Sequence, residues 1–314
     1  MSRKASITPL MANGRKKQGF QLFLISIPFL AAYFVFSYLP LYGWSYAFFD
    51  YRAGLDLFKT PFVGFKYFTS MVANSVLKAD VIRVLINTFG ISGLGIITSF
   101  LPMFFAIALS EIHLSPYRRI VQTITTIPNF ISWVIVYSLV FVLFSVNDGV
   151  VNKVFLDLGI FDKPYNFLAS EKHVWLTMWA YGTWKGLGWS SIIYYATITG
   201  IDAELFEAAT VDGASRIQRI INITIPGMMP TFSVLLLLSI SNFLNNGMDQ
   251  YYVFQNAMNK QYIEVLDLYV YNRGFVGRDI PFSVAVGILK TLVSVTLLFT
   301  ANGISKLIRK ESIF

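Results

Sequence analysis

The sequence lacks cysteine and has only two histidines, His113 and His173, which stand far apart. Disulfides, thiolate metal sites and cysteine nucleophiles are therefore excluded, and two isolated histidines cannot form a His-rich metal cluster. Charge is also scarce, since 13% of the 314 residues are Asp, Glu, Lys or Arg, against about 25% in soluble domains. The net charge of +8 is not arranged as a basic stripe with interleaved aromatic residues. We therefore expect neither a bound metal nor a nucleic-acid partner.

Hydrophobic residues make up 55% of the chain and aromatic residues 17%. A helix of about 20 residues crosses the hydrocarbon core of a bilayer, and six apolar stretches reach this length. The sequence therefore predicts an all-α integral membrane protein with one membrane domain, 21–314, after a basic tail, 1–20. The six expected transmembrane helices are 21–44, 87–110, 121–144, 174–199, 226–246 and 282–304.

The distribution of Lys and Arg predicts the orientation. The tail 1–20, the turn "HLSPYRR" at 113–119 and the end "SKLIRKESIF" at 305–314 are basic, as cytoplasmic segments are. The first apolar run is too long for a signal peptide, so we expect an uncleaved first span and cytoplasmic N- and C-termini. The loops 45–86, 145–173 and 247–281 are then external; within the first of these, the less apolar segment 49–68 is expected to be interfacial or outward-facing.

The segment 200–225 is cytoplasmic by the same count, yet it contains four acidic residues against two arginines. Asp202 is a good N-cap, residues 203–211 favour a helix, and Asp212 with Gly213 allows a turn with positive φ. A second helix is expected to begin at 215 and to be delimited by Pro226. The segment therefore predicts a helix–turn–helix outside the bilayer, suited to docking into a groove of another protein.

This segment, "EAATVDGASRIQRIINITIPGMMP" at 207–230, resembles the EAA loop of permease subunits of binding-protein-dependent ABC importers. The stretch 184–209 is similar to the span and loop of the carbohydrate-uptake type. The end 285–314 resembles the branch that imports oligosaccharides derived from polysaccharides. The likeness covers most of 20–314 and departs from many relatives at Ile220, which stays apolar. It implies the type I importer transmembrane fold, with 200–225 as the coupling loop.

The resemblance also implies a multi-subunit machine in the bacterial cytoplasmic membrane. Its expected partners are a second, homologous permease subunit, two cytoplasmic ATPase subunits, an extracellular solute-binding protein, tethered to lipid or membrane, and an oligosaccharide. Glu207 is expected to pair with basic groups of the ATPase, and Asp212 lies beside the turn. Ala208 and Ala209 are expected to allow close approach, and Gly213 to form the turn.

No phosphate-binding motif G-x-x-x-x-G-K-[ST] occurs in the sequence. We therefore expect a transport subunit that is not itself an enzyme and binds no cofactor, while separate ATPase subunits use ATP and Mg²⁺. The glycines of "GTWKGLG" at 182–188 fit helix packing better than phosphate binding. Gly182 and Gly186 form a G-x-x-x-G pair that favours close helix contact.

A sugar path needs polar groups for hydroxyls and aromatic faces for pyranose rings. Lys185 lies within a predicted span, with Tyr181 and Trp189 one turn away on the same face. Ser239, Asn242 and Asn246 are expected on one face of the fifth helix, with Asn245 set against Asp249. The predicted substrate path comprises Tyr181, Trp184, Lys185, Trp189, Asn242, Asn245, Asn246, Asp249 and Lys290.

Several alternatives remain open at this point. Lys185 fits a path residue, a snorkelling lysine or a partner for a carboxylate of another subunit, and Lys290 fits the path or an ion pair. Two lysines along a path would suit a substrate with carboxylates. An ion-coupled secondary sugar transporter is the alternative function, but its typical buried carboxylates are missing from the expected spans. An intramembrane enzyme would need a convergent catalytic set, and none assembles.

Overall fold

The structure, a computed structural model, describes residues 9–309. Within this range the regular structure is helical, and the only strand-like pairing is an isolated bridge between Phe49 and Phe62. The predicted all-α class is therefore confirmed for the described residues. The predicted tail lies partly outside them, at 1–8, as does the end of the basic C-terminal segment, at 310–314.

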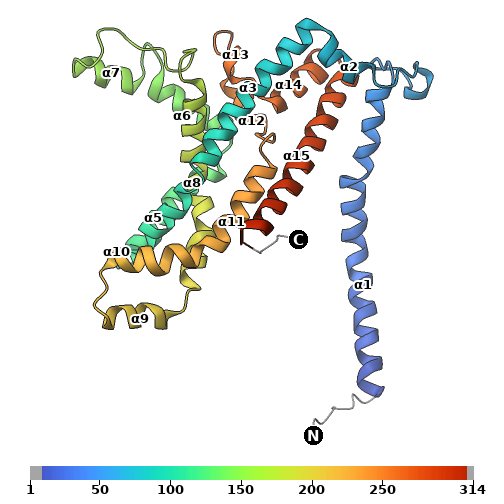
Figure 1. The fold of residues 1–314 in the computed structure, drawn as a ribbon. Coiled ribbons are helices and arrows are strands. Elements are labelled where there is room, and N and C mark those ends of the chain that lie inside the picture. Colours follow the sequence, from blue (N-terminus) through green and yellow to red (C-terminus); the bar gives the residue numbers. More distant parts are fainter. Residues whose placement is uncertain (1–8, 310–314) are drawn as a thin grey trace.

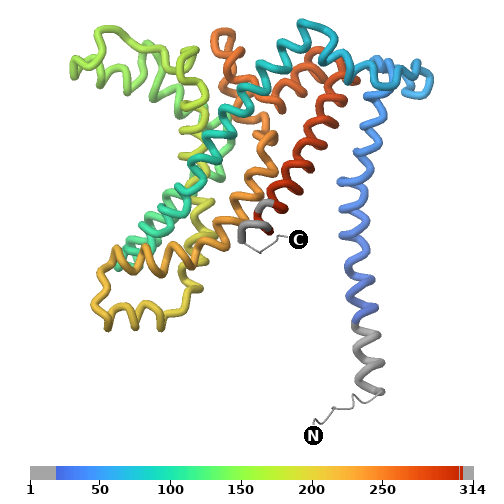
Figure 2. Tube along the Cα trace, in the orientation of Figure 1, coloured from blue at the N-terminus to red at the C-terminus, as the bar shows by residue number. Residues whose placement is uncertain are grey.

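The first helix, α1 (Pro9–Ser37), stands apart from the rest of the chain in Figures 1 and 2. It reaches the body of the molecule through the 3₁₀ helix η1 (Leu39–Phe48), which packs against the last helix, α15 (Ile280–Arg309). The predicted span 21–44 therefore changes helix type after Ser37. Pro40 has no N–H for the α-helical ladder, which gives the physical reason.

The second predicted span, 87–110, begins earlier than expected. Helix α3 (Ser75–Ile97) starts at Asn74, whose side chain caps it by accepting from the N–H groups of Val76 and Leu77. A short break leads into α4 (Leu101–Ser110), with a proline in its first turn. The expected external loop 45–86 is therefore helical at its end. The first turns of α3 are polar because they pair with other parts of the chain.

The third predicted span, 121–144, is a broken helix. Helix α5 (Ser115–Thr126) and the 3₁₀ turn η3 (Ile127–Phe130) meet α6 (Trp133–Phe144) at an angle of 107°. Ser132 caps the new helix by accepting from the N–H of Ile135. Pro128 and this cap interrupt the α-helical ladder, which a count of apolar residues does not detect.

The next predicted span, 174–199, coincides with α8 (Val174–Thr199), which packs against α3, α4, α5 and α11 (Ile225–Ser241). The predicted span 226–246 is displaced, because α11 is preceded by helical residues from 216 and ends at Ser241. The last span, predicted at 282–304, lies inside α15. Outside 200–225, the other helical elements are η2 (Leu57–Lys59), α2 (Lys66–Ala73), α7 (Val150–Asp157), α12 (Asp249–Phe254), α13 (Lys260–Ile263), α14 (Leu266–Tyr271) and η5 (Asn272–Val276).

The segment 49–68 lies at the end of η1, on the side of the molecule opposite the coupling loop (Figure 1). The Tyr67 hydroxyl donates to Asp50 Oδ1 at 2.7 Å. This hydrogen bond is the main reason why the pKa of Asp50 lies below its ordinary value. The hydrogen bond thus holds the beginning of the segment, at Asp50, against the first turn of α2, at Tyr67.

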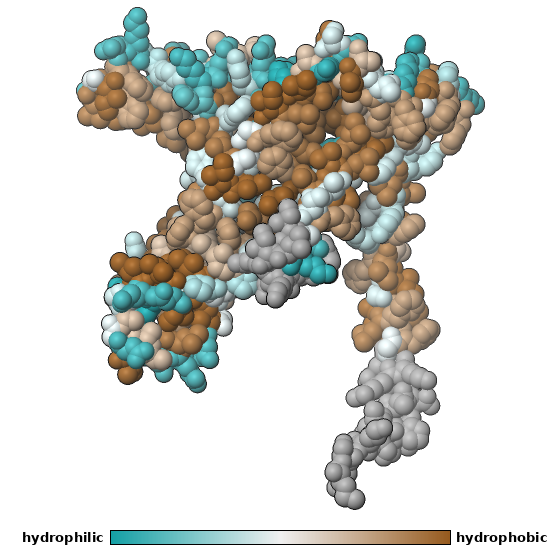
Figure 3. Space-filling model, viewed as in Figure 1, coloured by the Kyte–Doolittle hydropathy of each residue, from teal (hydrophilic) through white to brown (hydrophobic). Residues whose placement is uncertain are grey.

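Four described helical stretches are long and apolar enough to cross a membrane, or five if the bent pair is one span. They are Gly19–Phe48, Ser75–Ser110, Arg216–Ser241 and Ile280–Gly303, with Ser115–Phe130 and Trp133–Phe144 as the pair. Helix α8 is 26 residues long but is not among them. The number of six membrane spans therefore stays a prediction: it requires that the bent pair is one span and that α8 also crosses the membrane. Figure 3 shows hydrophobic residues predominating below the upper rim, where hydrophilic residues gather, while hydrophilic and hydrophobic residues mix on the surface of the segment 200–225.

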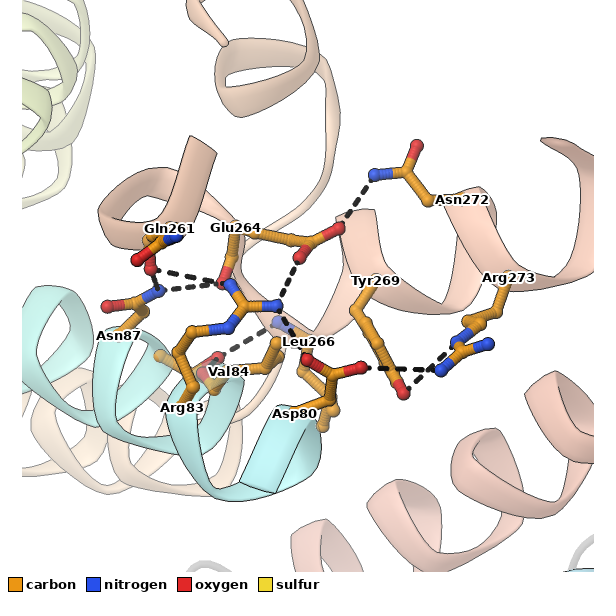
Figure 4. A network of polar contacts seen from close by, with 11 residues as sticks. Asp80, Arg83, Val84, Asn87, Gln261, Glu264, Leu266, Tyr269, Asn272 and Arg273 are labelled. Carbon is orange, nitrogen blue, oxygen red and sulfur yellow. Dashed lines mark hydrogen bonds and ion pairs between the residues drawn. The ribbon is translucent and has the colours of Figure 1, made fainter. Parts of the chain in front are cut away.

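A charged network fixes the start of α3 to α13, α14 and η5 at that upper rim (Figure 4). Arg83 Nη2 lies 2.9 Å from Oε2 of Glu264, which is buried. Asn272 donates to the other carboxylate oxygen of Glu264 at 2.8 Å. Asp80 lies 3.5 Å from Arg83 and 3.3 Å from Arg273. Because each carboxylate has a cationic or amide partner, the polar start of α3 is accommodated inside the fold.

Candidate functional site

The segment 200–225 forms the predicted helix–turn–helix. Helix α9 (Ala203–Val211) begins at Asp202, which accepts from the N–H of Glu204 at 3.0 Å. Gly213 has φ +76°, where a side chain would be strained. Ser215 then caps α10 (Arg216–Arg219) in a reciprocal capping box with Gln218. Each of these local signals is readable in the sequence, and the structure confirms the local geometry.

The expected end of the second helix at Pro226 is wrong. A π-helical turn, η4 (Ile220–Thr224), follows α10 and leads directly into α11, which has the proline in its first turn. The change of hydrogen-bond register just before Pro226 accommodates a residue without an N–H. The helix therefore runs from the coupling loop into the membrane domain without a joint.

The coupling loop projects from the lower end of the molecule in Figure 1. Glu207, Ala208, Asp212 and Gly213 are exposed, and Ala209 is half-buried. Apolar side chains are exposed beside them, and Val211 reaches 88% exposure. An exposed surface that mixes acidic and apolar groups is typical of a protein docking site. The predicted coupling role of these five residues is not tested by the chain alone.

A second candidate site is a groove between α3, α4, α8 and α11, which we call the central groove. It consists of two adjoining cavities of about 770 Å³ and 310 Å³. Both cavities are lined by Gly95, Ser99, Pro102 and Ser190. The groove is therefore large enough for several sugar rings along its length.

Hydroxyl, amide and aromatic groups line the central groove together with aliphatic side chains of α8 and α11, such as Ile193 and Leu235. The Trp179 indole N–H donates to Thr98 Oγ1 at 2.8 Å, which orients its ring. The hydroxyl and aromatic lining residues that the sequence did not single out come from α3, α8 and α12 and the connection between α3 and α4. They are Ser92, Thr98, Ser99, Trp179, Thr183, Ser190, Tyr194 and Tyr251. Small and aromatic residues repeat along α8, but the sequence of this helix does not show which of its faces lines the groove.

Of the nine predicted path residues, Trp189, Asn242 and Asn246 line the central groove. The expected single helical face for Ser239, Asn242 and Asn246 is wrong, because α11 ends at Ser241 and Asn246 lies in an irregular segment. That segment bends back toward α3, where Asn246 donates to Ser92 Oγ at 2.9 Å. The tertiary fold, and not helical periodicity, brings Asn246 to the groove.

Lys185 is directed toward the broken helix. Its Nζ donates to the backbone carbonyl of Asn129 at 2.8 Å and lies 5.4 Å from the ring centroid of Trp133. Lys185 does not line the central groove. A cation at a carbonyl in the last turn of η3 satisfies an acceptor that the bend leaves free. None of the readings left open for Lys185 included this contact.

Lys290 forms an ion pair with Asp267 of α14, which also accepts from the N–H of Gly247 at 2.8 Å. Of the two alternatives for Lys290, the structure thus shows the ion pair. The Asn245 amide donates to Asn242 Oδ1 at 3.3 Å instead of meeting Asp249. Asp249 begins α12. Lys290, Asn245 and Asp249 do not line the central groove, and their role in substrate transport stays a prediction.

Tyr181 and Trp184 also lie away from the central groove. Tyr181 packs against Phe254, with ring centroids 5.1 Å apart, and Trp184 is 46% exposed. The residues at i±4 from Lys185 thus do not form one functional face. Tyr181 belongs to a hydrophobic cluster with α6 and α12, while Trp189 meets Phe130 edge to face.

Among the glycines of "GTWKGLG", the one that allows close helix contact is Gly188. A Cβ there would lie 2.2 Å from the Thr125 carbonyl oxygen, so α5 and α8 approach closely at this point. At Gly186 a Cβ would meet nothing within 4 Å, and at Gly182 only the Gln250 side chain at 3.5 Å. The predicted packing role of the Gly182 and Gly186 pair is therefore wrong. Both glycines instead widen the central groove, which they line.

Comparison with known proteins places these features in a family. Residues 99–310 match the family described as the binding-protein-dependent transport system inner membrane component. Protein LplB of Bacillus subtilis (strain 168) is 36% identical, and the match covers 93% of this chain and 91% of that protein. The polygalacturonan/rhamnogalacturonan transport system permease protein YteP of the same organism is 34% identical, over 93% and 90% of the two chains.

A solved structure agrees with the sequence comparison. A chain of a bacterial ABC transporter involved in the import of the acidic polysaccharide alginate is 30% identical and superposes with a TM-score of 0.83. The match covers 95% of this chain and 99% of that one. The two chains thus share the same overall fold. The chain belongs to the family of inner membrane components of binding-protein-dependent transport systems.

Proposed function

We propose that this chain is the permease subunit of an ATP-driven ABC importer that moves oligosaccharides derived from polysaccharides across the bacterial cytoplasmic membrane. The observation that carries the proposal is the central groove of hydroxyl, amide and aromatic groups in a chain of this family. Relatives named for transport of galacturonan polymers and alginate support the cargo class. An ion-coupled secondary transporter is disfavoured by the family membership.

The working importer would contain a second, homologous permease, two ATPase subunits and an extracellular solute-binding lipoprotein. The membrane component is not itself the ATPase, so ATP and Mg²⁺ would be used by the partner subunits. The coupling loop would sit in a cleft of an ATPase subunit, and closure of the ATPase pair would move it as a rigid body. The unbroken helical path from α10 into α11 supports this role, since it transmits a displacement without a flexible joint.

Within the loop, Glu207 would pair with basic groups of the ATPase. Ala208 and Ala209 would permit close approach, while Asp212 and Gly213 would shape the turn. The exposure of Glu207 on α9 supports this assignment, because the carboxylate is available to a partner. Both chain termini would be cytoplasmic, on the side of the coupling loop, in agreement with the basic segments at 113–119 and 305–314.

The test is a charge reversal in the reconstituted importer. Glu207→Lys should lower binding-protein-stimulated ATP hydrolysis and oligosaccharide uptake by about tenfold or more, since it replaces attraction by repulsion at a buried charge pair. Glu204→Lys, an equally exposed position on the same helix, is the matched control and should retain most activity. Unchanged uptake and ATP hydrolysis in Glu207→Lys would refute the coupling role.

A further inference from the structure

A further cavity lies at the upper rim, on the side of the molecule opposite the coupling loop (Figure 1), and we call it the rim cavity. Its walls are the start of α3, parts of α12, α13 and α14, and η5, and the charged network of Figure 4 lines it. None of the nine predicted path residues lines it. Its volume of about 650 Å³ falls within the range of sites for small molecules.

The carboxylates of the rim cavity are already engaged by the protein itself. The two oxygens of Glu264 accept from Arg83 and Asn272. The two oxygens of Asp80 accept from Arg83 and Arg273. Two carboxylates thus balance two guanidinium groups, and no further cation is needed to satisfy the acids of this network.

A third cation, Lys260, also lines the rim cavity. Its side chain is exposed and forms no ion pair with any described residue. The lining therefore carries one positive charge more than its acids balance. A surplus cation in a cavity raises the affinity for an anionic ligand.

Hydrogen-bond donors of the lining are also left over. Arg273 uses Nε on the Tyr269 hydroxyl and Nη2 on Asp80, but no described residue accepts from its Nη1. The side-chain amide of Gln255 likewise has no partner among the described residues. Neither group is buried, so both can reach a ligand. Together with Lys260, they provide donors that a carboxylate and sugar hydroxyls can use.

An aromatic ring completes the wall and connects the rim cavity to the central groove. Tyr252 is 47% exposed, and Tyr271 holds its ring edge to face, with centroids 5.6 Å apart. Tyr252 lies on α12, whose residues Gln250 and Tyr251 line the central groove. Helix α12 is thus a wall that the two cavities share. This position favours a ligand that moves on into the groove over a partner protein that stays outside.

We propose that the rim cavity is a binding site for the uronate units of an acidic oligosaccharide, ahead of the central groove on the transport path. Lys260 and Arg273 meet the carboxylate, Gln255 meets sugar hydroxyls, and Tyr252 contacts a pyranose face. The proposal rests on the proposed function and narrows its substrate class. Because the coupling loop is assigned to the cytoplasmic side, the rim cavity opens toward the outside, where the sugar arrives.

Direct binding to the purified importer complex, without the solute-binding protein, tests the site free of that protein's own selectivity. The probes are a 1,4-linked galacturonate pentamer and its methyl ester, which share length, linkage and ring type and differ in charge at C6. Isothermal titration calorimetry should show the free acid binding about tenfold or more tightly than the ester. Equal binding, tighter binding of the ester, or no binding of either probe would overturn the proposal.

Substitutions locate the binding. Lys260→Gln should lower the affinity for the free acid by about tenfold and abolish its advantage over the ester. Lys163→Gln removes the same charge from an exposed position outside the rim cavity and should preserve that advantage. Tyr252→Ala should weaken binding of both probes, whereas Tyr252→Phe, which keeps the ring, should not. Equal losses in the two lysine variants would place the effect outside the rim cavity and contradict the site.

An acidic segment of the solute-binding protein is the other occupant that a surplus cation would suit. If Lys260→Gln left binding of the free acid unchanged but raised the concentration of solute-binding protein needed to stimulate ATP hydrolysis, the rim cavity would be a docking site and the proposal would be overturned. Uptake of a neutral oligosaccharide by an importer that fails these tests would leave the proposed function intact. Absence of uptake with every oligosaccharide would refute the proposed function itself.

Discussion

The coupling loop and the central groove are adjacent parts of one polypeptide, yet their structures depend on different information. The loop is built from neighbours within a few residues: the Asp202 cap, the Gly213 turn and the Ser215 capping box. The groove is built from α3, α4, α8, α11 and α12, which are far apart in the chain. Local chemistry determines the first, and helix packing determines the second.

The strongest test of this comparison concerns the packing that shapes the groove. Gly188→Ala should destabilise the protein by about 3 kcal/mol, because its Cβ would lie 2.2 Å from the Thr125 carbonyl and force α5 away from α8. Thermal unfolding of the purified complex measures the loss. Gly186→Ala, two residues away and facing open space, is the matched control and should be neutral or slightly stabilising. Equal effects at the two positions would contradict the close contact.

A smaller effect is expected at the bend between η3 and α6. Lys185→Met keeps most of the side-chain length but removes the donor to the Asn129 carbonyl, and should cost about 1 to 2 kcal/mol of stability. Affinity for an oligosaccharide substrate, measured on the same preparation, should not change, since Lys185 lies outside the groove. A large loss of affinity with unchanged stability would show that Lys185 takes part in substrate binding after all.

The smallest effect belongs to the coupling loop itself. Asp202→Ala removes the N-cap of α9 and should destabilise that helix by about 1 kcal/mol without affecting the groove. Hydrogen exchange should therefore accelerate in 203–211 and stay unchanged in α8. Glu204→Ala serves as the control, because only the backbone of Glu204 takes part in the cap. Accelerated exchange in both helices would show that the loop is not an independent local unit.

Prediction from sequence was most accurate where one segment carried its own signals. The 174–199 span coincides with α8, and the Asp202 cap and the Gly213 turn of the loop lie at the predicted residues. Prediction was least accurate where the backbone hydrogen-bond pattern of a helix changes. This happens at Pro40, at the bend after Pro128, and just before Pro226, where a π-helical turn lets the helix continue. A proline in the sequence shows that one backbone N–H is missing, but the surrounding packing determines whether the helix ends, bends or continues.

Charged residues show the same difference between what local sequence indicates and what tertiary contacts determine. Asp80 and Arg83 lie in the segment 45–86, which was expected to be an external loop. The structure places them in the first turns of α3, where Glu264 and Arg273 from the distant segment 260–276 neutralise them. Lys185 and Lys290 were correctly singled out as unusual, but their partners, Asn129 and Asp267, are 56 and 23 residues away.

The sequence by itself determined the membrane class, the family resemblance and the form of the coupling loop, because hydrophobic run length, caps and positive-φ turns act over short distances. Only the tertiary structure decided which face of α8 lines the groove, which of its glycines meets another helix and which polar residues line the groove. Those properties depend on partners from other helices. Asn246, for example, reaches the groove only because its segment bends back to Ser92, 154 residues away along the chain.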